Sequence, residues 1–318
     1  MIGALAAMML AGVAQQGDHI TRTEIVAPGP SGALKGTLTS LGMRGEQVIL
    51  IVPGSGPTDR DGNNRLGVAA STYRLLAEAL AKEGIASVRI DKRGMFGSAA
   101  AIADANAVTI NDYAQDVHAW ARAISQRTSA RCVWVLGHSE GGLVALQAAQ
   151  QSSGICGLIL VATPGRPMGD ILKAQLRANP ANASLLPDAD RAIDTLASGS
   201  RVDPATLPAP LQPLFPAVVQ EFLISAFALD PARLIKSVRL PVLIMQGTHD
   251  LQVELADATR LAAAKPNSRL VELADVNHVL KPVASSDRAA NVATYAAPDL
   301  PLAPAVVPAI AAFVSRPR

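Results

Sequence analysis

One pentapeptide of the chain has the residue types and the spacing that nucleophilic catalysis requires. Residues 137–141 read Gly-His-Ser-Glu-Gly, so a serine has glycine two positions before it and two positions after it. An apolar run at 132–136 leads into the pentapeptide, and a helix-forming run at 141–146 leads out of it. A tight turn between a strand and a helix presents such a serine at the carboxyl edge of a sheet, where larger side chains at the glycine positions would collide. The pattern predicts that Ser139 is a nucleophile.

A serine hydroxyl is a weak nucleophile at neutral pH and needs a base close by. The candidate base is His278, which lies in the short loop 274–278 after the predicted strand 269–273. A loop at the carboxyl edge of the last strand can place an imidazole over the serine. Four other histidines are set aside by position: His19 beside the N-terminal segment, His118 in an amphipathic helix, His138 with its ring expected to point away from the serine, and His249 next to an acid.

The imidazole in turn needs a buried acid that fixes its tautomer and stabilises its cation. Asp250 is the candidate because it closely follows the predicted strand at 242–245, whereas the preceding strand ends in Ala-Thr-Pro at 162–164 without a carboxylate. The chain order serine, acid, histidine is the one expected for a serine in this kind of turn. Two alternatives stay open: Asp250 caps the following helix, or Asp275 supplies the acid.

Acyl transfer also needs hydrogen-bond donors that are aimed at the oxyanion. One expected donor is the backbone N–H of Glu140, directly after the nucleophile. The second is expected from the glycine-rich loop 53–57 after the first long parallel strand, where Ser55 holds the favoured position; an ordinary turn would read the same way. Four nearby charges either brace this loop as a network or belong to a solvated loop: Asp59, Arg60, Asp61 and Arg93.

Strand-forming and helix-forming runs alternate along most of the chain, as they do in a parallel sheet covered by helices on both faces. Strands are expected at 23–26, 33–39, 48–52, 86–90, 133–136, 158–161, 242–245 and 269–273, and helices at 73–82, 110–126, 141–151, 256–264 and 306–314. The alternation stops between 164 and 236, which is rich in Pro, Ala and Leu and has helical spacing around 171–176 and 218–227. We expect a core in two parts, 18–163 and 237–318, and a helical lid insertion at 164–236.

Four segments of the chain together resemble a known family: 54–63, 91–94, 137–142 and 277–278. They are similar to bacterial α/β-hydrolases of the esterase and serine-aminopeptidase-like group, which includes enzymes like monoacylglycerol lipases. The resemblance spans nearly all of the chain beyond the N-terminal segment. It implies a mostly parallel eight-stranded sheet, a lid insertion, and hydrolysis of ester or related acyl bonds without a cofactor. The segment 91–98 departs from the family pattern by one extra residue before its second glycine, which alters a loop near the expected site.

The leading functional prediction is a carboxylesterase that acts on a small-molecule acyl ester. Thioester and peptide hydrolysis would use the same residues, so both stay open. A peptidase specific for free N-termini would need a carboxylate from the insertion, for which the candidates are Asp170, Asp188, Asp190, Asp194 and Glu221. A non-catalytic binding protein of this fold would be expected to lose one of Ser139, Asp250 and His278, and none is lost.

The composition gives no reason to expect other classes of partner. The formal net charge is +2, so neither nucleic acid nor an acidic membrane surface is indicated. No apolar run is long enough for stable insertion across a membrane. The sequence leaves the oligomeric state open.

The N-terminal residues 2–14 form a short apolar run of small residues that ends abruptly at Gln15. Such a run is typical of a secretory signal, and Gly12 and Ala14 have the spacing for cleavage after Ala14. No Lys or Arg precedes the run, so a retained apolar leader is the alternative. The sequence thus predicts a signal peptide at 1–14 and a periplasmic or secreted protein, with a cytoplasmic protein as the alternative.

The chain has two cysteines, which are too few for a disulfide scaffold or a zinc site. Cys132 lies seven residues before Ser139, and Cys156 lies seven residues before Thr163. If consecutive strands are neighbours, these equal offsets place the cysteines side by side at the edge of the sheet opposite the site. Adjacent strands lie about 4.8 Å apart, so a disulfide is our hypothesis for an oxidising compartment.

Overall fold

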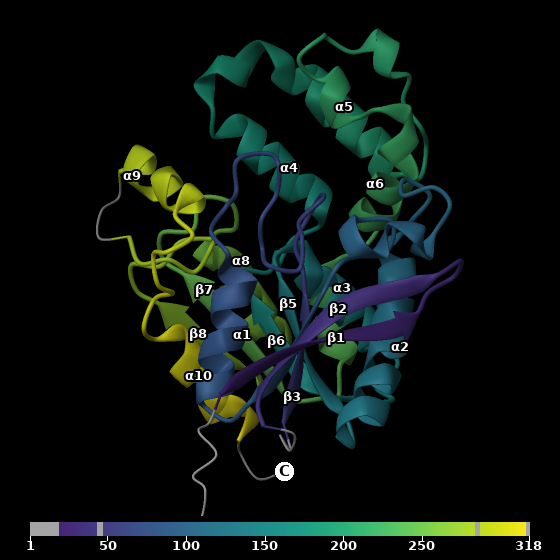
Figure 1. Ribbon diagram of the computed structural model, residues 1–318. Coiled ribbons are helices and arrows are strands. Elements are labelled where there is room, and N and C mark those ends of the chain that lie inside the picture. The colour runs from purple at the N-terminus through teal and green to yellow at the C-terminus, as the bar shows by residue number, and fades with distance from the viewer. Residues whose placement is uncertain (1–18, 43–46, 284–286, 316–318) are drawn as a thin grey trace, which may run out of the picture.

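The structure is a computed structural model that describes residues 19–42, 47–283 and 287–315. The predicted leader at 2–14 lies outside the described residues. An eight-stranded sheet forms the middle of the molecule, in the order β1-β2-β4-β3-β5-β6-β7-β8 (Figure 1). Its strands are β1 (Ile20–Pro28), β2 (Ala33–Leu41), β3 (Val48–Val52), β4 (Ala86–Ile90), β5 (Val133–His138), β6 (Ile155–Val161), β7 (Val242–Gly247) and β8 (Arg269–Leu273).

Strand β2 is antiparallel to both β1 and β4, and every pair from β4 to β8 is parallel. This topology confirms the mostly parallel, eight-stranded sheet that the sequence predicted. The carboxyl ends of the parallel strands therefore meet along one edge, and the segments that follow β3, β5, β7 and β8 lie together there (Figure 1).

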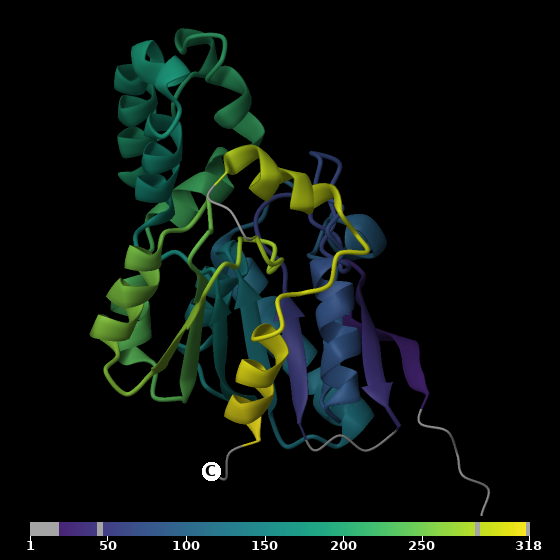
Figure 2. The same ribbon diagram turned by 90° about the vertical axis from the view of Figure 1, so that its left-hand side faces the viewer.

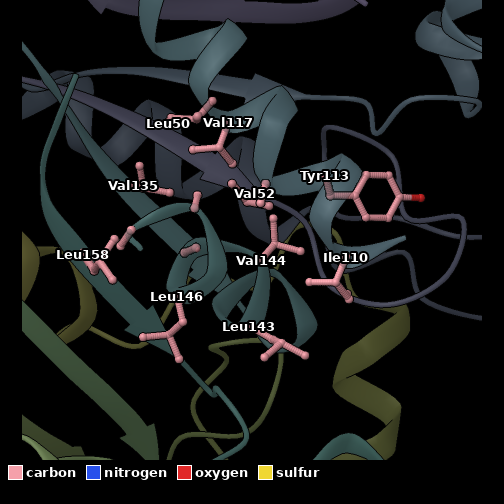
Figure 3. Close-up of a cluster of buried hydrophobic side chains, with 14 of the residues drawn as sticks. Leu50, Val52, Ile110, Tyr113, Val117, Val135, Leu143, Val144, Leu146 and Leu158 are labelled. Atoms are coloured by element: carbon pink, nitrogen blue, oxygen red, sulfur yellow. The ribbon is translucent and has the colours of Figure 1, made fainter. Parts of the chain in front are cut away.

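Helices cover both faces of the sheet (Figures 1 and 2). One face carries α1 (Thr72–Lys82) and α10 (Val306–Val314), and the other carries α2 (Ile110–Thr128), α3 (Glu140–Ala148) and α8 (Leu255–Ala264). The two-residue period of a strand divides the core between them. In β3, Ile49 and Ile51 are buried with α1 and α10, whereas Leu50 and Val52 are buried with α2 and α3 (Figure 3). Coverage on both faces is why the central strands read as continuous apolar runs.

Between β6 and β7 the chain leaves the sheet and forms a helical insertion, most of which lies above the carboxyl edge (Figures 1 and 2). These are α4 (Met168–Arg177), α5 (Leu186–Ala197), α6 (Gln220–Phe227) and α7 (Pro231–Ser237), with 3-10 helices η2 (Pro180–Leu185), η3 (Pro204–Thr206), η4 (Gln212–Leu214) and η5 (Ala217–Val219). α5 contacts α4 and α6, while α7 returns along α3 and α8. The sequence indicated α4 and α6, but α5 and α7 were not predicted.

Two further segments flank the carboxyl edge. η1 (Phe96–Ala101) follows β4, and α9 (Arg288–Ala293) with η6 (Thr294–Ala296) follows β8 and crosses above the strand ends (Figure 2). Within the described ranges no single helix has the length and apolarity to cross a membrane. One bent pair, Gln212–Phe227 with Pro231–Ser237, meets that criterion only when its two parts are combined.

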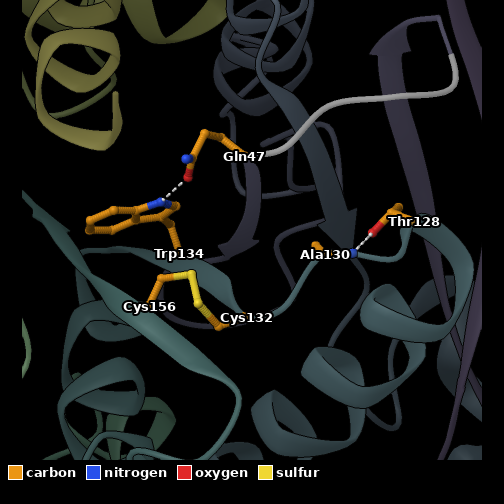
Figure 4. Close-up of a disulfide and its surroundings, with 6 residues drawn as sticks. All are labelled: Gln47, Thr128, Ala130, Cys132, Trp134 and Cys156. Carbon is orange, nitrogen blue, oxygen red and sulfur yellow. Dashed lines mark hydrogen bonds between the residues drawn. A yellow bond between two sulfur atoms is a disulfide. The ribbon is translucent and has the colours of Figure 1, made fainter. Parts of the chain in front are cut away.

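Cys132 and Cys156 form a disulfide at the amino-terminal edge of the sheet, with their Cα atoms 5.2 Å apart (Figure 4). The predicted proximity is confirmed, although the register is not the regular one that equal offsets assumed. Cys156 is the extra residue of a β-bulge in β6, between the partners of Val133 and Trp134. A bulge re-aims a side chain, and here it brings Cys156 to a residue that lies just outside β5.

We expect the Cys132→Ala, Cys156→Ala double variant to unfold at a lower urea concentration than the oxidised wild type. A bond across a sequence separation of 24 residues restricts the unfolded chain, which stabilises the folded protein by about 3 kcal/mol. Reduced wild-type protein is the matched control and should unfold with the variant. Equal midpoints for all three samples would mean that the bond does not stabilise the fold.

Candidate active site

Ser139 lies in a strained turn between β5 and α3. Its torsion angles are φ 55° and ψ −123°, outside the regions that L-residues usually occupy. The flanking glycines are packed against other backbone atoms. A Cβ at Gly137 would lie 2.2 Å from the carbonyl oxygen of Gly141, and a Cβ at Gly141 would lie 2.3 Å from that of Val52. The packing therefore requires glycine at both positions, as the sequence predicted, and it holds Ser139 beside the end of β3.

His278 and Asp250 form a buried pair. His278 Nδ1 lies 2.8 Å from Asp250 Oδ2, and the two side chains are 6% and 1% exposed. The other carboxylate oxygen, Oδ1, accepts the backbone N–H groups of Gln252 at 2.8 Å and Val253 at 3.0 Å. Burial by itself raises the pKa of Asp250, but His278 and the two backbone N–H groups outweigh it and hold this pKa below its usual range. Asp250 therefore stays charged and faces the imidazole.

The structure distinguishes the two alternatives to Asp250 as the orienting acid, which were Asp275 as the acid and a capping role for Asp250. Asp275 is 68% exposed, and its carboxylate lies 3.8 Å from Nε2 of His249. Asp250 does cap the backbone that follows it, but with Oδ1, while Oδ2 faces His278. The Asp250 carboxylate thus caps the backbone with Oδ1 and orients His278 with Oδ2.

The candidate nucleophile, base and oxyanion loop line one small cavity of about 120 Å³. Ser139 follows β5, His278 follows β8, and Gly54 and Ser55 follow β3, so the ends of three strands contribute. A Cβ at Gly54 would lie 3.3 Å from the Ser139 Cβ, which shows how closely the loop approaches the turn. Glu140 is the first residue of α3, so its N–H belongs to the unpaired donors of a helix N-terminus. Ser139, His278 and Ser55 thus line one cavity, while Asp250 contacts His278 and Glu140 directly follows Ser139.

Two side chains that the sequence analysis did not select lie beside this cavity. The His138 ring, expected to point away from the serine, packs against the His278 ring with centroids 4.8 Å apart. Its Nε2 lies 2.8 Å from the backbone oxygen of His278, and its Nδ1 lies 2.9 Å from Tyr73 Oη. Burial, and then the charge of His278, lowers the pKa of His138 to about 3. Tyr73 was missed because it reads as an ordinary apolar position of α1.

A buried cation lies on the other side of the oxyanion loop. Lys92 Nζ donates to the carbonyl oxygen of Gly54 at 2.7 Å and to the Glu140 carboxylate at 3.3 Å. The side chains of Lys92 and Glu140 are each 3% exposed. Separating the two groups would leave a buried charge without a partner, so Lys92 and Glu140 are held together. One sequence feature pointed to Lys92: it lies in the segment 91–94 that carried the family resemblance.

The four loop charges do not form the single network that was considered for them. Each pairs instead outside the set or with its own loop: Arg60 with Asp91, Asp61 with Arg89, Arg93 with Asp116, and Asp59 with backbone N–H groups at 61 and 63. The Arg60 pair has an N–O distance of 2.5 Å and ties the loop after β3 to the end of β4. Its partner could not be identified from the sequence, because the two residues lie 31 positions apart.

The chain belongs to the alpha/beta hydrolase family. The sequence model of this family matches residues 49–301, which include Ser139, Asp250 and His278. Esterase EstD of Thermotoga maritima is 23% identical over 239 residues, which is 73% of this chain and 54% of EstD. The chain thus spans about half the length of this curated relative.

Solved structures of several proteins share the fold. Est1E from Butyrivibrio proteoclasticus has a TM-score of 0.56 and 16% identity, over 92% of this chain and 99% of Est1E. An esterase from Pyrococcus furiosus has a TM-score of 0.53 and 18% identity, over 82% and 83% of the two chains. Proline iminopeptidase from Mycobacterium smegmatis has a TM-score of 0.54 and 16% identity, over 81% and 92%. At these identities the likeness shows the fold alone.

We expect Asp250→Asn to lower kcat for an ester substrate by roughly 10⁴-fold, because an amide at this position favours the wrong imidazole tautomer. Steady-state kinetics with p-nitrophenyl acetate measures the loss. Asp275→Asn is the matched control, since the same change there removes a carboxylate that faces solvent and His249. A large loss in the control together with near-normal activity of Asp250→Asn would reassign the acid.

Proposed function

We propose that this chain is a serine hydrolase that cleaves carboxylic esters, with Ser139 as nucleophile, His278 as base and Asp250 as the orienting acid. One observation carries the proposal: the buried 2.8 Å contact between His278 Nδ1 and Asp250, beside a cavity that Ser139 and His278 both line. An imidazole held through Nδ1 keeps Nε2 available to accept and return a proton. EstD and the Pyrococcus furiosus protein are named as esterases, which supports ester bonds as the substrate.

In the proposed reaction, Ser139 Oγ attacks the ester carbonyl while His278 Nε2 takes its proton. The tetrahedral oxyanion accepts hydrogen bonds from the backbone N–H groups of Ser55 and Glu140. His278 then gives the proton to the leaving alkoxide, which departs as an alcohol and leaves an acyl-enzyme. A water molecule, deprotonated by the same imidazole, repeats these steps on the acyl-enzyme and releases the acid. Asp250 stabilises the imidazolium in both halves.

The insertion at 164–236 is proposed to act as a lid over this chemistry. Val219 and Phe222 from the insertion line a cavity together with Gly56 and Pro57 of the oxyanion loop. A helical cover of this kind excludes water and shapes the space for the substrate. Phe222 also meets the Tyr113 ring with centroids 6.1 Å apart, so the cover rests directly on α2.

Ester hydrolysis is favoured over cleavage at a free N-terminus. Four of the five acidic residues considered for binding an ammonium group pair with basic residues of the insertion: Asp188 with Arg191, Asp190 with Arg177, Asp194 with Lys173 and Glu221 with Arg201. The described residues that line the two cavities near Ser139 include no Asp or Glu. An ammonium group would therefore lose its hydration without gaining a carboxylate partner.

We also propose that the protein works in an oxidising compartment, such as the periplasm or the extracellular space. The disulfide between Cys132 and Cys156 supports this location, because such bonds persist where thiols are not kept reduced. The apolar run at 2–14 is the candidate export signal.

We expect Ser139→Ala to lose ester turnover by roughly 10⁴- to 10⁶-fold, since the three residues act as a unit. A fluorophosphonate probe should label Ser139 in the wild type, as read by peptide mass spectrometry, and should not label the variant. Ser153→Ala, an exposed change after α3, is the control and should be labelled at the wild-type rate. Equal labelling of Ser139→Ala would remove Ser139 from the mechanism.

A further inference from the structure

Two cavities of very different size lie on either side of the oxyanion loop. The smaller, of about 120 Å³, contains Ser139 and His278 and is bounded by Val68, Val279 and Tyr295. The larger, of about 750 Å³, is lined by Gly56 and Pro57 of the same loop. A substrate carbonyl at Ser139 therefore has little room on the His278 side and much more room beyond the loop.

The wall of the larger cavity is mainly apolar. Met95, Phe96, Val108, Tyr113 and Phe222 line it from three separate parts of the chain. Phe96 remains 43% exposed, so apolar surface is left uncovered at this cavity. Met95 and Phe96 lie in the segment 91–98, which departs from the family pattern by one residue.

The wall of the larger cavity is continuous with the oxyanion loop. Phe222 packs on Tyr113, and the Lys92 ammonium lies 5.2 Å from the Tyr113 ring centroid. The same ammonium donates to the carbonyl oxygen of Gly54 at 2.7 Å. A group in this cavity would therefore lie directly behind the donors that hold the substrate carbonyl.

We propose that the larger cavity binds the acyl group of the ester, which is large and apolar, and that the smaller cavity binds the alcohol group, which is small. The inference rests on the proposed ester hydrolysis. The leaving oxygen must receive its proton from His278, so the alcohol lies on the His278 side. The acyl group then extends in the other direction, past the oxyanion loop, into the apolar cavity. The substrate class is thus short-alcohol esters of aromatic or long aliphatic acids.

Two isomeric esters test this orientation: methyl 4-phenylbutanoate and 3-phenylpropyl acetate carry the same ring and chain on opposite sides of the ester group. We expect kcat/KM to be higher for the methyl ester by roughly tenfold to a hundredfold. Ala99→Trp places a ring in the larger cavity and should reduce this preference by roughly tenfold. Ala100→Trp, at the exposed neighbouring position, is the matched control and should keep the wild-type ratio.

The outcomes separate this inference from the proposed function. Equal turnover of both isomers, a preference for the acetate, or an unchanged ratio in Ala99→Trp would overturn the assignment of the cavities while leaving ester hydrolysis in place. Failure to cleave either isomer or p-nitrophenyl acetate, with no labelling of Ser139 by fluorophosphonate, would overturn the proposed function and this inference with it.

A second inference rests on a chain of hydrogen bonds that runs from His278 through His138 and Tyr73 to Gly54. A backbone carbonyl can only accept, so His138 Nε2 must carry the proton that is donated to His278 O. His138 is neutral, so its Nδ1 accepts the Tyr73 hydroxyl proton. The Tyr73 oxygen in turn accepts the N–H of Gly54 at 3.1 Å. Every donor and acceptor in this chain of contacts has one assignment.

The two peptide groups of Gly54 are thus held by different side chains. Its N–H is tied through Tyr73 and His138 to the backbone of His278, and its carbonyl oxygen is tied through Lys92 to the Glu140 side chain. We infer that Tyr73 and Lys92 are positioning residues, which set the oxyanion loop at a fixed distance from both the base and the nucleophile turn.

Tyr73→Phe tests this role, because it removes the oxygen that links Gly54 to His138 and keeps the ring. We expect kcat per active site to fall roughly tenfold to a hundredfold with little change in KM, since misplaced donors affect the transition state. Active sites are counted by fluorophosphonate titration. The Cys132→Ala, Cys156→Ala double variant is the control. It should be less stable than the wild type, but its substitutions lie at the opposite edge of the sheet, so its kcat should equal that of the wild type.

The split between kcat and KM distinguishes positioning from folding. A loss of titratable sites with normal kcat per site would mean that Tyr73 only stabilises the fold, and the inference would fail. A second variant, His138→Phe, breaks the same chain of contacts one step further on. Combining it with Tyr73→Phe should add little further loss in kcat, whereas fully additive losses would show that the two residues act separately.

Discussion

The strained backbone of Ser139 is the constraint on which the carboxyl edge of this molecule depends. A positive φ at a residue other than glycine costs on the order of 1–3 kcal/mol and persists only where the surroundings enforce it. Here the enforcement comes from both neighbouring strands. A Cβ at Gly141 would strike the carbonyl oxygen of Val52 in β3, and a Cβ at Gly142 would lie 2.0 Å from Thr163 Oγ1 beyond β6. These contacts fix the position at which α3 begins. The packing that places Ser139 therefore also places the first N–H groups of α3.

Charge at this edge is balanced within a space that excludes most water. Asp250 is compensated by His278 and by backbone N–H groups, and Lys92 is compensated by Glu140. A cation on His138 would oppose the imidazolium that the proposed mechanism forms on His278, whose ring lies 4.8 Å away. Burial prevents this because it holds the pKa of His138 at about 3. A neutral His138 can therefore touch the base without competing for its charge.

The sequence predicted the features that depend on local pattern and on strand ends. β3, β4 and α10 begin and end where their apolar runs do, because buried parallel strands and core helices leave a continuous hydrophobic signal. The bounds of β8 were also predicted, although it is a partly exposed edge strand. α5 and α7 left no comparable signal: both have proline in their first turn, and the insertion that contains them is rich in Ala and Pro. Side-chain partners such as Tyr73 and His138 lie 65 positions apart and depend on the fold, not on spacing. The β-bulge at Cys156 likewise could not be predicted from the spacing of residues along the sequence.

The residues proposed to carry the chemistry and the residues that line the larger cavity come from different stretches of the chain. Ser139, Asp250 and His278 follow core strands, whereas the cavity wall comes from the segment after β4, from α2 and from the insertion. Such a division lets the wall change without moving the reacting groups. Lys92 is where the two meet, since one ammonium group contacts the oxyanion loop, Glu140 and the Tyr113 ring. In the proposed mechanism, a substrate that presses on Tyr113 would therefore also act on the oxyanion donors, and Lys92 would couple selectivity for the acyl group to the rate of its transfer.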